Sequence, residues 1–189
     1  MKKSENMKSV YMPLLLALGL SLAGLSVSAQ NHSKSVYGEL LGASQMIGVN
    51  YDARFNRAVP YGLGWRTGLG FGYAYSSSSA VALSFADGEM PVAYNRMFRY
   101  AVPLEVNYLL GKGKSKFESG AGAIVCLDRF TSDTGGAPEH SFGAIPYFSL
   151  GYRLVTDKGF LLRAGAMPLL SFSPFHVSFY PYLGFGWAF

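Results

Sequence analysis

The 189-residue sequence is weakly charged and rich in aromatic residues and glycine: 14% of its residues are charged, 15% are aromatic and 23 are glycine. Its formal net charge of +5 is too mild to indicate binding to nucleic acid or to an anionic membrane surface. The single cysteine, Cys126, cannot form an internal disulfide. Beyond the first 29 residues, no stretch approaches the roughly 18 apolar residues of a membrane-spanning helix. A closed β-barrel can supply stability instead, because every backbone group is paired and no edge remains.

The first 29 residues have the features of an export signal. Lys2, Lys3 and Lys8 precede an apolar run over residues 14–25, and Val27-Ser28-Ala29 offers small residues for cleavage. We therefore expect a signal peptide over 1–29, followed by a single β-barrel domain over 30–189.

Eight later segments alternate between apolar and polar or small residues, as β-strands with two different faces do. An even number of antiparallel strands brings both chain ends to the same side of a barrel. The short connections then lie on the side of the termini, and the long connections over 76–99 and 128–141 lie on the other side. The short stretch 43–46 is an exception to this rule. The predicted strands are 36–42, 47–55, 63–75, 100–110, 117–127, 142–155, 159–170 and 179–189.

The segment over 76–99 allows an alternative with ten strands. Residues 80–85 and 90–94 flank Asp87-Gly88, which is a hairpin signal. However, the first of these segments is short for a spanning strand, and Pro91 interrupts strand pairing. We therefore expect an extracellular hairpin that extends the third and fourth strands.

The last eleven residues alternate most clearly. Phe179, Pro181, Leu183, Phe185, Trp187 and Phe189 share one face, and small or hydroxylated residues share the other. This pattern predicts a transmembrane strand with an apolar outer face and an aromatic girdle. A terminal Phe after alternating aromatic residues resembles the signal that outer-membrane barrels present to their insertion machinery. Phe185, Trp187 and Phe189 would form that signal.

Several of these segments resemble small outer-membrane barrels from Bacteroides-type bacteria. The similar stretches are 36–42, 49–55, 103–112, 117–122, 151–154 and 160–165. The resemblance implies an eight-stranded antiparallel barrel in the outer membrane, with membrane lipid and the barrel insertion machinery as partners. It implies no reaction and no cofactor. The long loops over 76–99 and 128–141 would be available to an extracellular ligand.

The charged residues of the predicted strands share the face opposite the large apolar residues. A lipid-facing Arg or Lys near the middle of the bilayer costs about 2–4 kcal/mol, so this face must line the lumen. Four acids and four bases then balance, and in so narrow a barrel they have to pair. The sequence therefore predicts an ion-pair network that plugs the lumen, built from Glu39, Asp52, Arg54, Arg66, Glu105, Glu118, Arg153 and Arg163.

The outer half of the lumen is predicted to be lined by small and apolar residues. One interpretation is a packed core, and the other is a cup for a hydrophobic ligand above the ionic plug. The residues concerned are Gly70, Gly72, Ala74, Gly122, Ile124, Ile145, Tyr147, Met167, Leu169, Tyr180 and Tyr182.

Signals for catalysis are weak. His176-Val-Ser178 resembles the His-x-Ser of outer-membrane lipid A deacylases, but it is only three residues long and no acidic partner is near. None of the three histidines has metal-ligand spacing to Cys126. The preferred prediction is a non-enzymatic barrel with a structural or surface-interaction role. The alternatives are a barrel that binds a hydrophobic ligand and a lipid A-modifying hydrolase.

Overall fold

The computed structural model describes residues 32–75, 95–133, 135, 137–172 and 175–189, and their side chains except those of 169–172 and 175–178. The predicted signal peptide and the predicted hairpin over 80–94 lie outside the described residues. Among the described residues, no helix is long and apolar enough to cross a membrane.

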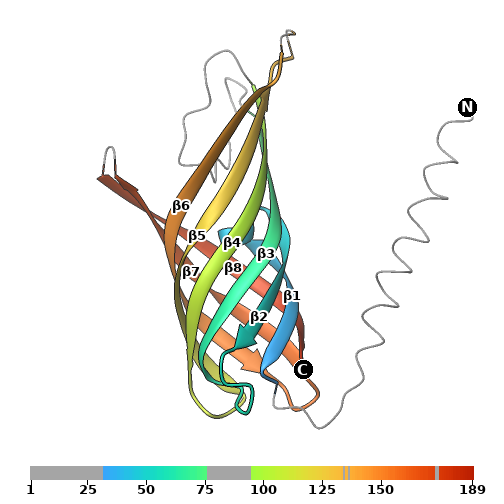
Figure 1. Cartoon of the computed structure of the whole chain (residues 1–189), viewed down its shortest axis with the longest axis vertical. Helices are drawn as coiled ribbons and strands as arrows, with labels where there is room; N and C mark the ends of the chain where they lie inside the picture. Colours follow the sequence, from blue (N-terminus) through green and yellow to red (C-terminus); the bar gives the residue numbers. More distant parts are fainter. Residues whose placement is uncertain (1–31, 76–94, 134, 136, 173–174) are drawn as a thin grey trace, which may run out of the picture. The chain divides into compact units, whose positions relative to one another are not determined.

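Eight antiparallel strands close into a barrel in which each strand pairs with the next and β8 pairs with β1 (Figure 1). The eight-strand prediction is confirmed. The ten-strand alternative is wrong, because β3 pairs directly with β4 from Gly62 opposite Leu109 to Tyr75 opposite Arg96. The strands are β1 (Lys34–Leu41), β2 (Ile47–Arg54), β3 (Gly62–Tyr75), β4 (Arg96–Leu110), β5 (Ser115–Thr131), β6 (Glu139–Val155), β7 (Phe160–Phe172) and β8 (Phe175–Ala188).

The alternation of the sequence becomes an apolar outer wall and a polar interior. On β4, Leu104, Val106 and Tyr108 are exposed, whereas Glu105 and Asn107 are buried. Such a wall is stable only when lipid covers it, because water would leave its apolar side chains unburied. The fold is therefore that of a transmembrane barrel.

The barrel wall is much taller on one side than on the other. β1 and β2 have 8 residues each, whereas β5 and β6 have 17 each. A spanning strand needs about 9–11 residues, so β4, β5 and β6 continue past the wall at the end opposite the termini, which we call the extracellular end (Figure 1). We name residues 96–99, 128–131 and 139–142 the β4–β6 extension.

The predicted boundaries were wrong at this extension. β4 begins at Arg96 rather than at residue 100, β5 ends at Thr131 rather than at 127, and β6 begins at Glu139 rather than at 142. The cause is that alternation continues through this partly polar region, with Arg99, Asp128 and Phe130 buried between exposed or half-buried neighbours. Polar residues in this region were interpreted as loop.

The turn between β1 and β2 folds into the lumen. It contains a short 3-10 helix, η1 (Gly42–Ser44), in which all three residues are buried. Leu41 and Gln45 on either side of it have positive φ angles of 63° and 66°, a conformation that a non-glycine residue seldom adopts. Residues 43–46 do lie in a short connection between β1 and β2, as expected, but the sequence did not reveal that this connection turns inward. Ala43 and Ser44 are small enough to enter the barrel.

Candidate functional site: the ionic network of the lumen

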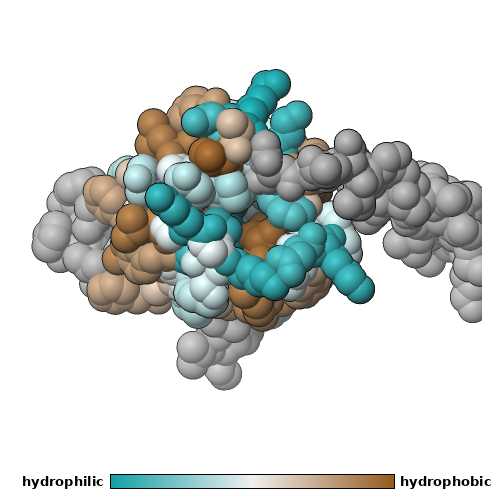
Figure 2. Space-filling view, turned by 90° about the horizontal axis from the view of Figure 1, so that it is seen from below, coloured by the Kyte–Doolittle hydropathy of each residue, from teal (hydrophilic) through white to brown (hydrophobic). Residues whose placement is uncertain are grey.

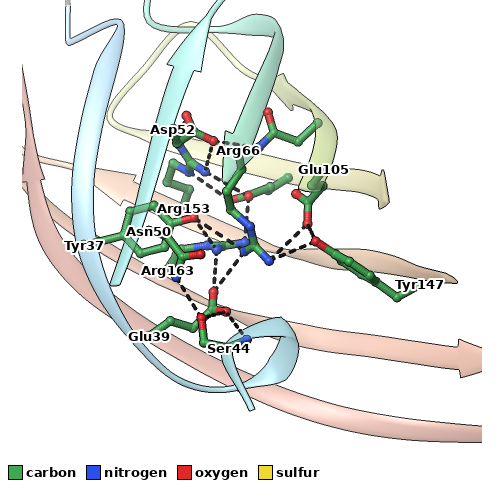
Figure 3. Close-up of polar contacts among 12 residues, drawn as sticks. Tyr37, Glu39, Ser44, Asn50, Asp52, Arg66, Glu105, Tyr147, Arg153 and Arg163 are labelled. Atoms are coloured by element: carbon green, nitrogen blue, oxygen red, sulfur yellow. Dashed lines mark hydrogen bonds and ion pairs between the residues drawn. The ribbon is translucent and has the colours of Figure 1, made fainter. Parts of the chain in front are cut away.

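The eight charged residues predicted to face the lumen are all buried in it, none of them more than 4% exposed. The network that they form has members on β1 to β7, because every one of these strands alternates its faces. Figure 3 shows how the side chains converge from the wall on the centre of the barrel. These charged side chains form two groups, and one arginine, Arg163, contacts members of both.

The first group centres on Asp52. The Arg153 guanidinium donates to both Asp52 oxygens, at 3.0 and 3.1 Å. Arg54 donates to Asp52 Oδ1 at 2.5 Å, and Asn107 donates to Asp52 Oδ2 at 2.6 Å. Arg153 also donates to Glu118, from Nε to Oε2 at 2.8 Å and from Nη2 to Oε1 at 2.9 Å. Arg153 thus bridges two carboxylates, for which its planar fork is suited.

The second group centres on Glu39 and Glu105. Arg66 donates to Glu39 Oε2 at 3.0 Å, and its other terminal nitrogen lies 3.3 Å from Glu105 Oε2. The Tyr147 hydroxyl donates to Glu105 Oε2 at 2.8 Å. The other oxygen of Glu39 accepts from the Ser44 hydroxyl of η1 at 3.0 Å. The inward turn is therefore tied to the network.

Arg163 joins the two groups and has no exposed surface. It donates to Glu39 Oε2 at 2.6 Å and to Glu118 Oε1 at 2.8 Å. Its guanidinium carbon lies 4.9 Å from the ring centre of Tyr37 and 4.5 Å from that of Tyr182, so it also makes cation–π contacts with two aromatic faces. A continuous set of ion pairs therefore links Asp52 to Glu105 across the lumen.

Two glycines make room for these long side chains. A Cβ at Gly184 would lie 2.8 Å from Cγ of Arg163, and a Cβ at Gly120 would lie 2.5 Å from Oε1 of Glu105. Only the strand register shows that each of these glycines lies next to a long charged side chain of another strand.

The structure adds residues that the sequence analysis missed. Tyr37 and Asn107 belong to the network, although neutral residues were not considered as members of it. Arg99 and Asp128 form a bidentate ion pair, at 2.6 Å for each contact, in the outer part of the barrel. This corrects the expectation that only small and apolar residues line that part. Lys116 is also buried on the inner face, near the termini. With it, the described interior carries six bases and five acids rather than four of each.

The residues predicted to line a cup are brought close together but lie in packed surroundings. Ile124, Tyr147, Met167 and Tyr182 form one buried cluster with Ala43 of η1, and Ile145 and Tyr180 pack against it. A Cβ at Gly70 would lie 2.5 Å from the carbonyl oxygen of Ser44, and one at Gly122 would lie 2.1 Å from that of Leu104. A Cβ at Gly72 would lie 3.2 Å from Cβ of Gln45. Ala74 belongs to a separate cluster, and the Leu169 side chain is not among those that the structure describes. These contacts favour the packed interpretation over the hollow one.

The remaining predicted sites are on the periphery. Phe185 and Trp187 face outward and are exposed, and the Phe189 backbone pairs with that of Lys34 at 2.8 and 3.0 Å to close the barrel seam. The side chains of His176 and Ser178 lie outside the description. Among the described residues, no three His, Cys, Asp or Glu side chains gather as metal ligands.

No family model matches the sequence, and no curated protein matches it. Among solved structures, the chain is similar to the N-terminal β-barrel domain of Pseudomonas aeruginosa OprF, at 11% identity and a TM-score of 0.57, over 85% of this chain and 98% of that domain. It is also similar to Neisserial surface protein A (13% identity, TM-score 0.48, 82% of this chain and 94% of that chain). A third similar structure is Ail of Yersinia pestis in complex with the heparin analogue sucrose octasulfate (13% identity, TM-score 0.45, 82% of this chain and 95% of that chain).

This chain has the fold of a small outer-membrane β-barrel. The similarity to OprF concerns the fold alone, because few residues are identical, and it extends over nearly the whole OprF domain. The resemblance of this outer-membrane barrel to those of Bacteroides-type bacteria stays a prediction.

Proposed function

We propose that this outer-membrane barrel is a closed, non-enzymatic barrel whose ion network plugs the lumen and whose role is structural or in surface interaction. The observation that carries the proposal is the position of Arg163, which is fully buried and pairs with Glu39 of β1 and Glu118 of β5. A guanidinium held between two carboxylates and two aromatic rings leaves no path for hydrated ions at that level. An eight-stranded barrel has only enough interior for its own side chains.

The network also argues against general acid–base chemistry. Asp52, Glu39 and Glu118 each contact at least two arginines. The oxygens of these carboxylates are occupied by guanidinium groups inside a packed lumen, so they are not within reach of a substrate proton. The paired carboxylates therefore support a non-enzymatic interior, and the lipid A hydrolase remains an alternative for residues 176–178 only.

The β4–β6 extension supports a surface role. Its strands exceed the length that a membrane requires by about six residues, or roughly 20 Å of strand. It exposes Arg129, His140 and Phe142 beyond the wall. An extracellular ligand would meet these residues together with the connections between β3 and β4 and between β5 and β6.

The plug is tested by electrical recording of the purified, refolded barrel in a planar lipid bilayer. We expect no stepwise conductance from the wild-type barrel in about 1 M KCl, a concentration at which surface charge is screened. Arg163→Ala would remove the joining guanidinium, and it should produce measurable ion flow if the barrel stays folded. Reproducible ohmic conductance by the wild-type barrel would contradict the plugged lumen.

A further inference from the structure

The end of the barrel that carries the termini and the short turns, the periplasmic end, is strongly basic. We define the basic rim as the exposed or half-buried residues Lys34, Arg57, Lys112, Lys114 and Lys158. Within the described turns at this end, Asp157 is the only acidic side chain. Figure 2 looks onto this end and shows hydrophilic residues gathered around it, bordered by the apolar wall. The mild net charge of the whole sequence does not reveal that the basic side chains are concentrated at this end.

The extracellular end differs. Among its described residues, the exposed bases Arg96 and Arg129 are matched by the exposed acids Asp133 and Glu139, and Arg96 pairs with Asp133. The buried Arg99 and Asp128 balance each other as well. The excess positive charge of the described surface therefore lies at the periplasmic end.

The basic rim is placed at the depth of lipid headgroups. Exposed aromatic residues lie on the wall next to it, with Phe117 opposite Tyr152 and Phe160 opposite Trp187. Aromatic girdles of membrane barrels mark the boundary between hydrocarbon and headgroups. Lys114 and Lys158 lie two or three residues beyond Phe117 and Phe160, so their long side chains reach the layer of phosphate groups.

The rim charges are mostly not neutralised within the protein. Lys114 pairs with Asp157 at 2.5 Å, but both side chains are exposed, and such pairs contribute little. For Arg57, Lys112 and Lys158, the described part of the chain offers no acidic partner. Several like charges on one narrow ring repel one another unless anions lie between them.

We propose that the basic rim binds the headgroups of anionic phospholipids in the leaflet that surrounds the periplasmic end. Phosphate oxygens of lipid accept hydrogen bonds from Lys and Arg at the height of the ring. The ring follows the edge of a lipid-covered wall rather than a concave site for a soluble molecule. This assignment rests on the membrane position of the barrel and is independent of whether the lumen is plugged.

The two tryptophans of the sequence can report on this lipid. Trp65 on β3 and Trp187 on β8 both face outward in the half of the barrel that carries the basic rim. Bromine on a lipid acyl chain quenches tryptophan fluorescence on contact. Refolding the full chain into bilayers of phosphatidylcholine with increasing phosphatidylglycerol, either of them brominated, therefore measures which lipid contacts this half. The bilayer is symmetric, so the direction of insertion does not matter.

We expect phosphatidylglycerol to be enriched next to the tryptophans by roughly three- to tenfold at low salt, and the enrichment to fall at about 0.5 M salt, where charges are screened. The triple substitution Lys112→Gln, Lys114→Gln and Lys158→Gln should abolish most of it. The matched control, Arg96→Gln with Arg129→Gln at the extracellular end, should leave it unchanged. Heat-modifiable migration on gels verifies that each variant is folded.

Equal quenching by the two brominated lipids in the wild-type barrel would overturn the proposal. A preference that the triple substitution leaves intact would overturn it too, because the rim would not be its cause. Soluble poly-glutamate serves as a separate probe. Its binding to the rim without any preference for phosphatidylglycerol would point to an acidic polymer instead, and would also reject the lipid assignment.

Discussion

Three arginines of the lumen, Arg66, Arg153 and Arg163, each contact two carboxylates, and this sharing determines what a single substitution does. Arg153 contacts Asp52 and Glu118, which lie on β2 and β5. Removing it leaves Asp52 with Arg54 and Glu118 with Arg163 as their ion-pair partners. Two buried carboxylates then lose part of their compensation at once, although neither becomes completely unpaired.

Arg153→Met should therefore reduce the free energy of unfolding by roughly 3–5 kcal/mol, since Met fills a similar volume but leaves the buried negative charges. Heat-modifiable migration on gels, or unfolding by denaturant in detergent, measures the effect. Arg129→Met is the matched control, because Arg129 is exposed on the β4–β6 extension and its loss should change stability by about 0.5 kcal/mol or less. Equal melting of Arg153→Met and wild type would mean that the charges are solvated one by one.

Side-chain parity was predictable from the sequence at this scale, but the pairing was not. The alternation of Glu105 and Asn107 with apolar neighbours is enough to put both in the lumen. The contact of Arg153 with Asp52 joins residues 101 positions apart on opposite walls, and their relative height depends on the stagger of all the strands between them. For the same reason, the sequence did not reveal that the Arg66 guanidinium pairs with both Glu39 and Glu105.

Among the elements, η1 departs most from a regular barrel. It occupies lumen volume with Ala43 and ties the β1–β2 turn to Glu39 through Ser44. Alternation cannot reveal such an element, because the five-residue connection 42–46 is too short to show a period. The signal that was available is the small size of Gly42, Ala43 and Ser44, which permits a turn to enter a narrow barrel.

The filling of the outer lumen by η1 can be tested with Gly72→Leu. A Cβ at Gly72 would lie 3.2 Å from Cβ of Gln45 and 3.5 Å from Cβ of Arg99. A leucine there has to displace the side chain of Gln45, which directly follows η1, or that of Arg99, so we expect a loss of about 1–3 kcal/mol from overpacking. Denaturant unfolding in lipid or detergent measures the loss.

Gly143→Leu is a suitable control for this substitution. Gly143 lies on β6 with the same inward parity as Tyr147, and no described atom lies within 4 Å of a Cβ at that position. This variant should unfold like the wild type. If Gly72→Leu were neutral or stabilising as well, the outer lumen would be hollow, and the hydrophobic-ligand cup would be the better interpretation.

At the scale of the whole molecule, the number of strands and the end of the barrel at which each connection lies were predictable from the lengths of the segments and their alternation alone. The height of the barrel wall was not predictable, because the β4–β6 extension alternates its side chains in the same way as the strand segments within the membrane. Asp128 and Arg99 were interpreted as loop residues for that reason, although they are paired inside β4 and β5. A charge in a predicted loop that keeps strand parity with its neighbours is the signal that would have extended these strands.

Closure of the whole barrel depends on the seam between β1 and β8, where Phe189 pairs with Lys34. We expect Phe189→Asp to impair assembly in cells strongly while export continues. Near the membrane boundary, an acidic residue costs only about 1 kcal/mol or less in stability. The purified variant, refolded in detergent, should therefore unfold almost like the wild type. A large assembly defect with a small stability loss identifies a recognition signal rather than a packing role.

Phe160→Asp provides the comparison that decides between these two roles. Phe160 pairs with Trp187, so its aromatic ring lies at the same level as the chain end. The substitution has the same chemistry and depth but leaves residues 185–189 intact. Assembly, measured as the protease-resistant, heat-modifiable fraction in outer membranes, should be close to normal for Phe160→Asp and low for Phe189→Asp. If both variants assembled equally well, the last residues would not be the signal, and pairing of β8 with β1 would be enough to insert the barrel.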